Sequence, residues 1–199
     1  MLHELLHWIV IHYIEFIAVI AGIAYVYLSA KQVIWCWPVG IVNVVLSIYV
    51  FFVTKLYQDA ILQGFYLIMS IYGWYNWLHG GKNKSELQVS RLSLHLAIFI
   101  LIIAAVAIVA CGYFFNNYTD AALPYWDATT TVWGIIGTYL MAKKIIDNWV
   151  VWILIDILNV CIYYYKDLFG FTVLYFIFTI LAVYGLKEWL RDYRLKKTI

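Results

Sequence analysis

Seven apolar runs separated by short polar segments constrain this chain more than any other feature. They cover approximately residues 8–29, 33–54, 58–78, 93–115, 125–142, 148–165 and 168–189. A helix needs about 20 apolar residues to cross the hydrocarbon core of a bilayer, and it satisfies its backbone hydrogen bonds internally. The pattern therefore predicts an all-α integral membrane protein with seven transmembrane helices.

Composition supports the membrane prediction and excludes other classes. Hydrophobic residues make up 66% of the chain and charged residues 12%, whereas soluble domains are about half apolar and about a quarter charged. The net charge of +2 is too small for a nucleic-acid surface, so we expect no nucleic-acid partner. The runs leave no room for a catalytic domain, and no G-x-x-x-x-G-K-S/T phosphate loop occurs. We therefore expect a protein that is not an enzyme and needs no cofactor.

The residues that commonly bind metals form no convincing site. Cys36, Cys111 and Cys161 lie in apolar surroundings without C-x-x-C spacing. The segment from His3 to His7 matches the HExxH zinc-protease pattern, but no third ligand accompanies it. We interpret this segment as the polar start of the first helix and predict no metal site.

The basic residues predict the orientation of the chain. If the amino terminus lies outside the cell, eleven Lys and Arg residues fall in the cytoplasm, and only Lys55 and Lys166 fall outside. Cytoplasmic loops of membrane proteins are enriched in Lys and Arg. The N-terminus is therefore expected outside and the C-terminus in the cytoplasm.

Most of the tryptophans lie at the ends of apolar runs, where indole rings commonly anchor a protein at the membrane interface. The predicted anchors are Trp8, Trp35, Trp37, Trp74, Trp77, Trp126, Trp149 and Trp189. Only Trp133 and Trp152 lie far enough inside a run to favour a role in binding.

An internal repeat predicts how the spans are organised. Shifting the chain by 112 positions aligns residues 22–77 with residues 134–189 without a gap, and 17 of the 56 positions are identical. Matched pairs include Trp37 with Trp149 and Trp77 with Trp189. Because four spans separate equivalent helices, both units face the same way, and the fourth span acts as an inverter.

The repeat predicts a 3+1+3 arrangement of parallel repeats. The expected parts are 1–78 (first three-helix repeat), 79–92 (cytoplasmic linker), 93–115 (linking helix), 125–189 (second three-helix repeat) and 190–199 (basic cytoplasmic tail). Parallel repeats are typical of transporters whose substrate site lies near the membrane midplane. A duplicated structural bundle is the alternative.

Polar side chains at bilayer depth usually face the interior of a helix bundle, and four spans carry them with helical spacing. The candidate substrate-binding residues are Asn43, Ser47, Gln63, Tyr66, Asp127, Thr131, Trp133, Trp152, Asp156 and Asn159. Such a cavity suits a small polar ring compound with at most one positive charge, because aromatic faces stack rings and attract cations. Polar residues also join helices in membranes, and for any single residue both interpretations stay open.

Three segments carry a resemblance to a known family: Ile71 to Trp77 (IYGWYNW), Tyr125 to Asp127 (YWD) and Asn148 to Trp152 (NWVVW). Together they resemble the PnuC-type nicotinamide riboside transporter family, over approximately residues 15–190. This family is similar in design to a full-length, duplicated SWEET-like fold. The resemblance implies uptake of a vitamin precursor by facilitated diffusion across the bacterial inner (plasma) membrane. Alternating access and trapping by a cytoplasmic kinase are also implied.

The resemblance also implies residue roles. Positions that match the family pattern are Asn43, Gln63, Trp126, Asp127, Asn148, Trp149 and Trp152. Within the candidate site, Trp133 and Trp152 would stack the ring, Asn43, Gln63 and Asn159 would bond its polar groups, and Asp156 would oppose its charge.

The substrate and assembly state stay open at this point. Some relatives carry Asn where this chain has Asp156, and nicotinamide riboside and thiamine are both cationic heteroaromatic compounds. A carrier of thiamine or another vitamin precursor is therefore an alternative, with a sugar carrier or a non-transporting scaffold more remote. Oligomeric state is not predicted, because lipid-facing and subunit-facing surfaces have similar sequences.

Overall fold

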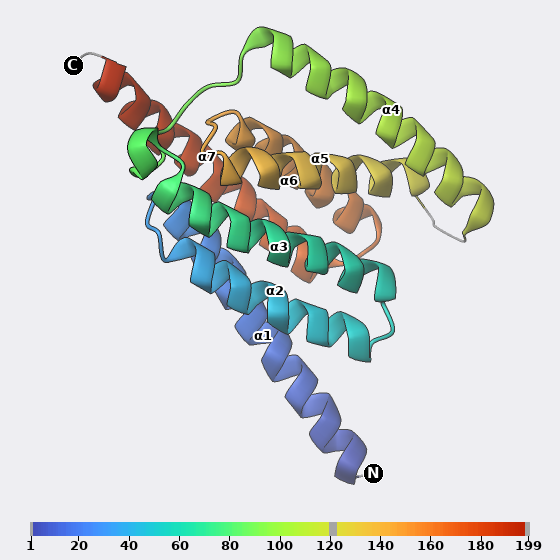
Figure 1. Cartoon of the computed structure of the whole chain (residues 1–199). Helices are drawn as coiled ribbons and strands as arrows, with labels where there is room; N and C mark the ends of the chain where they lie inside the picture. The colour runs from blue at the N-terminus through green and yellow to red at the C-terminus, as the bar shows by residue number, and fades with distance from the viewer. Residues whose placement is uncertain (1, 120–122, 198–199) are drawn as a thin grey trace. The chain divides into compact units, whose positions relative to one another are not determined.

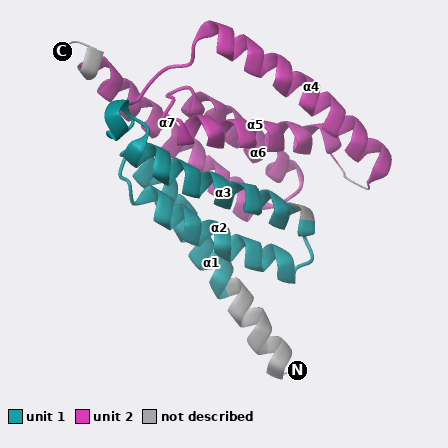
Figure 2. Cartoon of the chain, viewed as in Figure 1, with its two compact units in different colours: residues 1–88 teal, residues 89–199 magenta. Residues whose placement is uncertain are grey.

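The computed structural model describes the backbone of residues 2–119 and 123–197, with side chains for residues 13–57, 59–119 and 123–195. This part of the chain contains seven α-helices and one short 3-10 helix (Figure 1). The helices are α1 (Leu2–Ala30), α2 (Cys36–Val53), α3 (Tyr57–His79), η1 (Lys82–Lys84), α4 (Leu94–Tyr118), α5 (Pro124–Ala142), α6 (Asn148–Tyr165) and α7 (Phe169–Lys197). They form two compact units, Met1–Gln88 and Val89–Ile199 (Figure 2).

Helices replace each predicted apolar run, and five of those described are long and apolar enough to cross a membrane. These stretches are Tyr13–Ala30, Cys36–Val53, Leu94–Tyr118, Asn148–Tyr165 and Phe169–Leu195. Helices α3 and α5 fall outside this set, because polar side chains such as Gln63 and Asp127 lower their hydropathy. That these two helices also span the membrane stays a prediction.

In unit 1, α2 packs against both α1 and α3. The turn between α1 and α2 has the left-handed residue Gln32, with φ of 58°. Gln32 N–H donates to the Ser29 carbonyl (3.0 Å) and Val33 N–H to the Leu28 carbonyl (3.0 Å), a Schellman arrangement that satisfies the last carbonyls of α1. The turn between α2 and α3 repeats this geometry at Lys55, with φ of 62°.

Unit 2 repeats the same local structure 112 residues later. Lys144 and Asp167 have φ of 55° and 57°, at the positions matching Gln32 and Lys55. Helices α2 and α6 begin and end at matching positions. In unit 2, α6 packs against α5 and α7, and α4 packs along α5. The internal geometry of the two units therefore has the offset of the sequence repeat.

Four tryptophans that were predicted to be interface anchors are buried instead. Trp37 and Trp77 meet edge to face with ring centroids 5.3 Å apart, and Trp149 and Trp189 do so at 5.5 Å. None of the four is more than 2% exposed. The anchor interpretation is wrong for them, because each ring fills the contact between the second and third helices of its unit. The other described anchors are exposed, namely Trp35, Trp74 and Trp126.

The segment before α4 is bound to the turn between α5 and α6. Ser90 N–H donates to the Lys144 carbonyl (3.1 Å), and Ile146 N–H donates to the Ser90 carbonyl (2.9 Å). Leu92 N–H donates to Asp147 Oδ2 at 2.8 Å. Much of the predicted linker is thus ordered, and it holds the start of α6.

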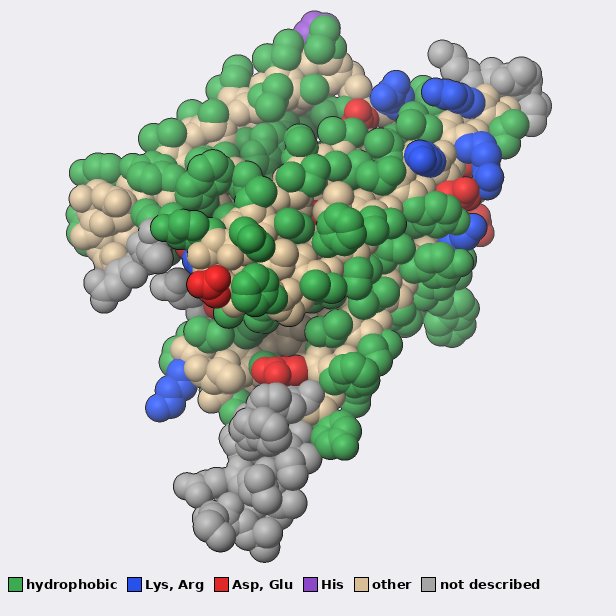
Figure 3. All heavy atoms as spheres, turned by 180° about the vertical axis from the view of Figure 1, so that it is seen from behind, with side chains coloured by type: hydrophobic (Ala, Val, Ile, Leu, Met, Phe, Trp, Pro, Cys, Tyr) green, Lys and Arg blue, Asp and Glu red, His purple; other side chains and the backbone are tan. Residues whose placement is uncertain are grey.

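Most of the surface is hydrophobic, as a membrane environment requires. Helix α4 illustrates this, because only Ala104 and Gly112 of its residues are buried. Figure 3 shows Lys and Arg side chains gathered near the C-terminal end of the chain. There α7 continues to Lys197, beyond the predicted end of the last span.

Candidate substrate site

Helix α6 carries the most distinctive part of the predicted site. Trp152, Asp156 and Asn159 lie at spacings of four and three residues, which places them on one helical face. Asp156 is 4% exposed and Asn159 is 9% exposed. Among the residues that the structure describes, neither side chain has a hydrogen-bond or ion-pair partner. An unpaired carboxylate in an apolar interior is costly, and within membrane segments such a group marks a pathway for a substrate or an ion.

The predicted polar face of α5 is present but only partly buried. Asp127 lies in the first helical turn and is half-buried, where a negative charge is favoured by the helix dipole. Thr130 Oγ1 donates to the Asp127 carbonyl at 3.0 Å. Thr131 is exposed. Of these residues, Asp127 is best placed to contact a polar solute.

Trp133 lies away from the predicted α6 partners. It lines a cavity of about 390 Å³ within unit 2, together with Thr129 of α5, Ile100 of α4 and Val151 of α6. None of the α6 candidate residues lines this cavity. Trp133 and Thr131 are two residues apart, so they point about 200° apart around the helix. The structure thus separates Trp133 from the polar face of α5.

In unit 1, the α2 candidates are bonded to backbone groups. Asn43 Nδ2 donates to the Ala18 carbonyl of α1 at 2.7 Å. Ser47 Oγ donates to the Asn43 carbonyl at 2.9 Å. Asn43 therefore joins two helices of its own unit, while its Oδ1 has no partner within the described residues.

The α3 candidates share one half-buried face. Gln63 and Tyr66 are three residues apart, and Ser70 follows four residues later. The Tyr66 ring meets that of Phe65 edge to face at 5.8 Å. Gln63 has no hydrogen bond to any described residue, so its amide is available to a solute.

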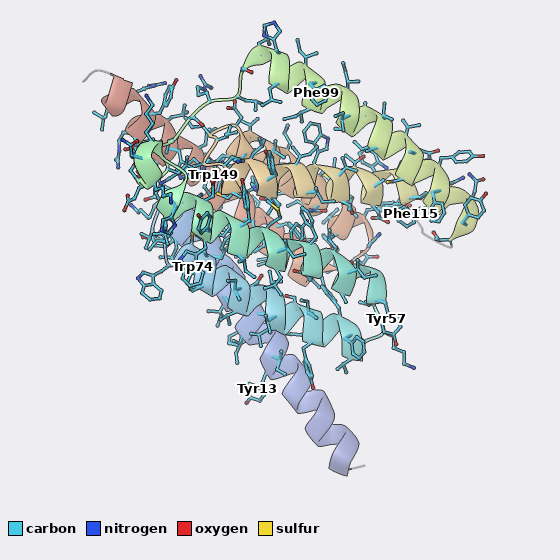
Figure 4. All side chains as sticks on the ribbon, viewed as in Figure 1. Tyr13, Tyr57, Trp74, Phe99, Phe115 and Trp149 are labelled. Carbon is cyan, nitrogen blue, oxygen red and sulfur yellow. The ribbon has the colours of Figure 1, made fainter. Side chains whose placement is uncertain are left out.

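Two residues that match the family pattern have structural contacts at the start of α6. Asn148 is fully buried and its Nδ2 donates to the Ile145 carbonyl at 2.6 Å. Trp149 is 1% exposed and packs on Trp189. Figure 4 shows Trp149 among the helices and Trp74 projecting outward. Trp149 thus contributes to the core of unit 2.

Sequence reasoning missed one residue beside the α6 face, namely Gly137 of α5. A Cβ atom at this position would lie 3.1 Å from Trp152 Cε2, so the indole rests almost on the α5 backbone. The signal was present in the repeat alignment, where Gly137 falls opposite Tyr25 and Trp152 falls opposite Gly40.

No cluster of three or more His, Cys, Asp or Glu side chains suited to a metal occurs among the described residues. The side chains of the HExxH segment, His3 to His7, lie outside that part of the chain.

Comparisons with known proteins place this geometry in a family. The nicotinamide riboside transporter PnuC of Escherichia coli (strain K12) is 28% identical over 207 aligned residues, covering 92% of this chain and 87% of that protein. The riboflavin/roseoflavin transporter RibM of Streptomyces davaonensis is 25% identical over 176 residues, covering 85% of this chain and 81% of that protein. Both relatives are transporters.

A solved structure shows the same fold. The crystal structure of the vitamin B3 transporter PnuC matches with a TM-score of 0.71 and 22% identity, over 90% of this chain and 81% of that one. The family model of the nicotinamide mononucleotide transporters matches residues 12–191. Since this match covers nearly the whole chain, the protein belongs to the nicotinamide mononucleotide transporter family.

Proposed function

We propose that this protein takes up nicotinamide riboside across the bacterial inner membrane by facilitated diffusion. The observation that carries the proposal is Asp156, a buried carboxylate with no partner among the described residues, one helical turn from Trp152. Nicotinamide riboside has a flat, positively charged pyridinium ring. An indole face and a carboxylate are the two groups that such a ring requires. Relatives named as nicotinamide riboside transporters support this choice.

Ten residues are assigned to the substrate site. Trp152 stacks the ring, Asp156 opposes its charge, and Asn159 bonds its polar groups. The others are Asn43, Ser47, Gln63, Tyr66, Asp127, Thr131 and Trp133. Gln63 has the stronger support, because its amide is free of other described residues. Trp133 has the weakest, because it lines a different cavity.

The proposed architecture is a 3+1+3 parallel repeat related in design to the SWEET fold. Its parts are residues 1–78, 79–92, 93–115, 125–189 and 190–199, with the N-terminus outside and the C-terminus in the cytoplasm. Support comes from the shared offset of 112 residues in sequence and in turn geometry. Alternating access then follows from movement of the two three-helix units around the site.

A cytoplasmic kinase is the proposed functional partner. Facilitated diffusion stops when the concentrations on the two sides are equal. Phosphorylation of the riboside gives it a charge that prevents return, so uptake continues.

Uptake by purified protein in proteoliposomes without an ion gradient tests the proposal. We expect saturable entry of labelled nicotinamide riboside that stops at equal concentrations. Thiamine is the second candidate, because it is also cationic and Asp156 suits it equally. Riboflavin makes a third arm, because one relative transports that neutral ring system. Entry of thiamine alone replaces the substrate, and entry of none of the three contradicts the transport proposal.

A further inference from the structure

The two units contain an exchange of a ring and a glycine at the same helix contact. In unit 1, Tyr25 of α1 lies against Gly40 of α2, where a Cβ atom would lie 2.7 Å from Tyr25 Cδ2. In unit 2, Gly137 of α5 lies against Trp152 of α6. Positions 25 and 137, like positions 40 and 152, are 112 residues apart. Each contact therefore holds one large ring, but from opposite helices.

The two rings are held in different ways. Tyr25 is hydrogen-bonded to the Ser29 side chain and meets Trp37 edge to face at 6.2 Å. Its ring is thus fixed within unit 1. Trp152 is half-buried, and within the described residues it has no hydrogen bond and no ring partner. Its indole is therefore available to stack a ligand, while that of Tyr25 serves packing.

We infer that Gly137 is a positioning residue for the substrate ring. A methyl group at position 137 would lie 3.1 Å from Trp152 Cε2 and 3.2 Å from Nε1, so the indole would have to move away from α5. Trp152 lies about 6 Å along the helix axis from Asp156. The absence of a side chain at position 137 sets where the indole lies relative to that carboxylate. The inference rests on the proposed function, in which Trp152 stacks the substrate.

A double-mutant cycle tests whether Gly137 acts through Trp152. The variants are Gly137→Ala, Trp152→Phe and the double variant, with affinity for nicotinamide riboside and Tm measured for each. In the Trp152 background, the alanine is expected to weaken binding by roughly three- to tenfold, the size of an aromatic stacking contact. In the Trp152→Phe background it is expected to have little effect, because the smaller ring leaves room for the methyl group. Such coupling between contacting residues is what the cycle isolates.

Unit 1 supplies the matched control. Gly40→Ala meets the Tyr25 ring, so it is expected to lower Tm and leave the affinity of the folded protein unchanged. If that variant does not fold, Tyr25→Phe removes the hydroxyl bonded to Ser29 and serves the same purpose.

Three outcomes overturn the inference: an unchanged affinity in folded Gly137→Ala, an equal change in both Trp152 backgrounds, or a Gly40→Ala effect on affinity as large as that of Gly137→Ala. Failure of the wild type to bind the riboside contradicts the proposed function instead, and the cycle is then run with whichever of thiamine and riboflavin binds. If none of the three binds, both proposals are wrong.

Discussion

At the residue scale, each unit interlocks two indoles through a glycine. A Cβ atom on Gly73 would lie 2.2 Å from Trp37 Cη2, and one on Gly185 would lie 2.6 Å from Trp149 Cζ2. Because such distances are far inside van der Waals contact, only glycine allows the rings to lie this close to the neighbouring helix. The family-like segment that ends α3 therefore has a packing reason.

Replacing this glycine should destabilise the protein. We expect Gly73→Ala to lower stability by about 1–3 kcal/mol, the usual cost of overpacking, seen as a lower Tm in detergent. Gly64→Ala in the same helix is the control, since nothing lies within 4 Å of its Cβ position. It is expected to be neutral or to stabilise by up to about 1 kcal/mol, because alanine favours helix formation. Equal Tm values for the two variants would argue against the interlock.

The charge of Asp156 leads to a second residue-scale prediction. Asp156→Asn retains the shape of the side chain and removes its charge. Affinity for nicotinamide riboside should fall by about tenfold or more, since interactions with a charged group are typically worth 1.5–3 kcal/mol. The uncharged dihydro form of the riboside should lose much less. A parallel loss for both ligands in binding assays would mean that Asp156 acts by shape or packing alone.

At the element scale, the short turns in both units depend on single left-handed residues. Lys55 ends the α2 turn and Asp167 ends the α6 turn, both with positive φ. This conformation costs a residue with a side chain about 1–2 kcal/mol. Glycine avoids that cost but loses more backbone entropy on folding.

Glycine at either turn should therefore stabilise the protein. We expect Asp167→Gly to raise stability by about 0.5–1 kcal/mol, measured by thermal unfolding. Its neighbour Lys166 has φ of −86°, so Lys166→Gly is expected to destabilise by a similar amount. The idea fails if both variants shift Tm in the same direction.

Helices α3 and α5 show how far sequence reasoning reached at this scale. Their ends were predicted within a few residues, because apolar runs and their interruptions are local features of the chain. The structure shows why their hydropathy is low: each carries polar candidates such as Gln63 and Asp127. Low hydropathy and site residues therefore occur together in these helices.

At the scale of the whole molecule, two units share one internal design. Both have a buried tryptophan pair, matching turns and a central helix of 18 residues. Unit 2 alone has the backbone bonds from Ser90 and Leu92 to the α5–α6 turn among the described residues. The duplication therefore preserved the core, while the connection to the second unit added contacts of its own.

The orientation of the molecule can be tested by cysteine labelling. In a variant without Cys36, Cys111 and Cys161, we expect Lys55→Cys to react with a membrane-impermeant maleimide in intact cells. Lys84→Cys should react only after permeabilisation, because α3 is the single crossing between the two positions and the basic loop is cytoplasmic. Reaction of both from the outside would contradict a transmembrane α3, and the reverse pattern would contradict the orientation.

The sequence by itself determined the helices, the 112-residue repeat and the family. Apolar length, helical spacing and conserved offset are all properties of contiguous residues, so no knowledge of packing is needed to find them. Only the tertiary structure decided the partners of individual side chains. It buried Trp37 and Trp149, bonded Asn43 to Ala18 and placed Trp133 in a cavity away from the α6 candidates. The reason is that a helix has several faces, and which neighbour covers each face depends on how the helices pack.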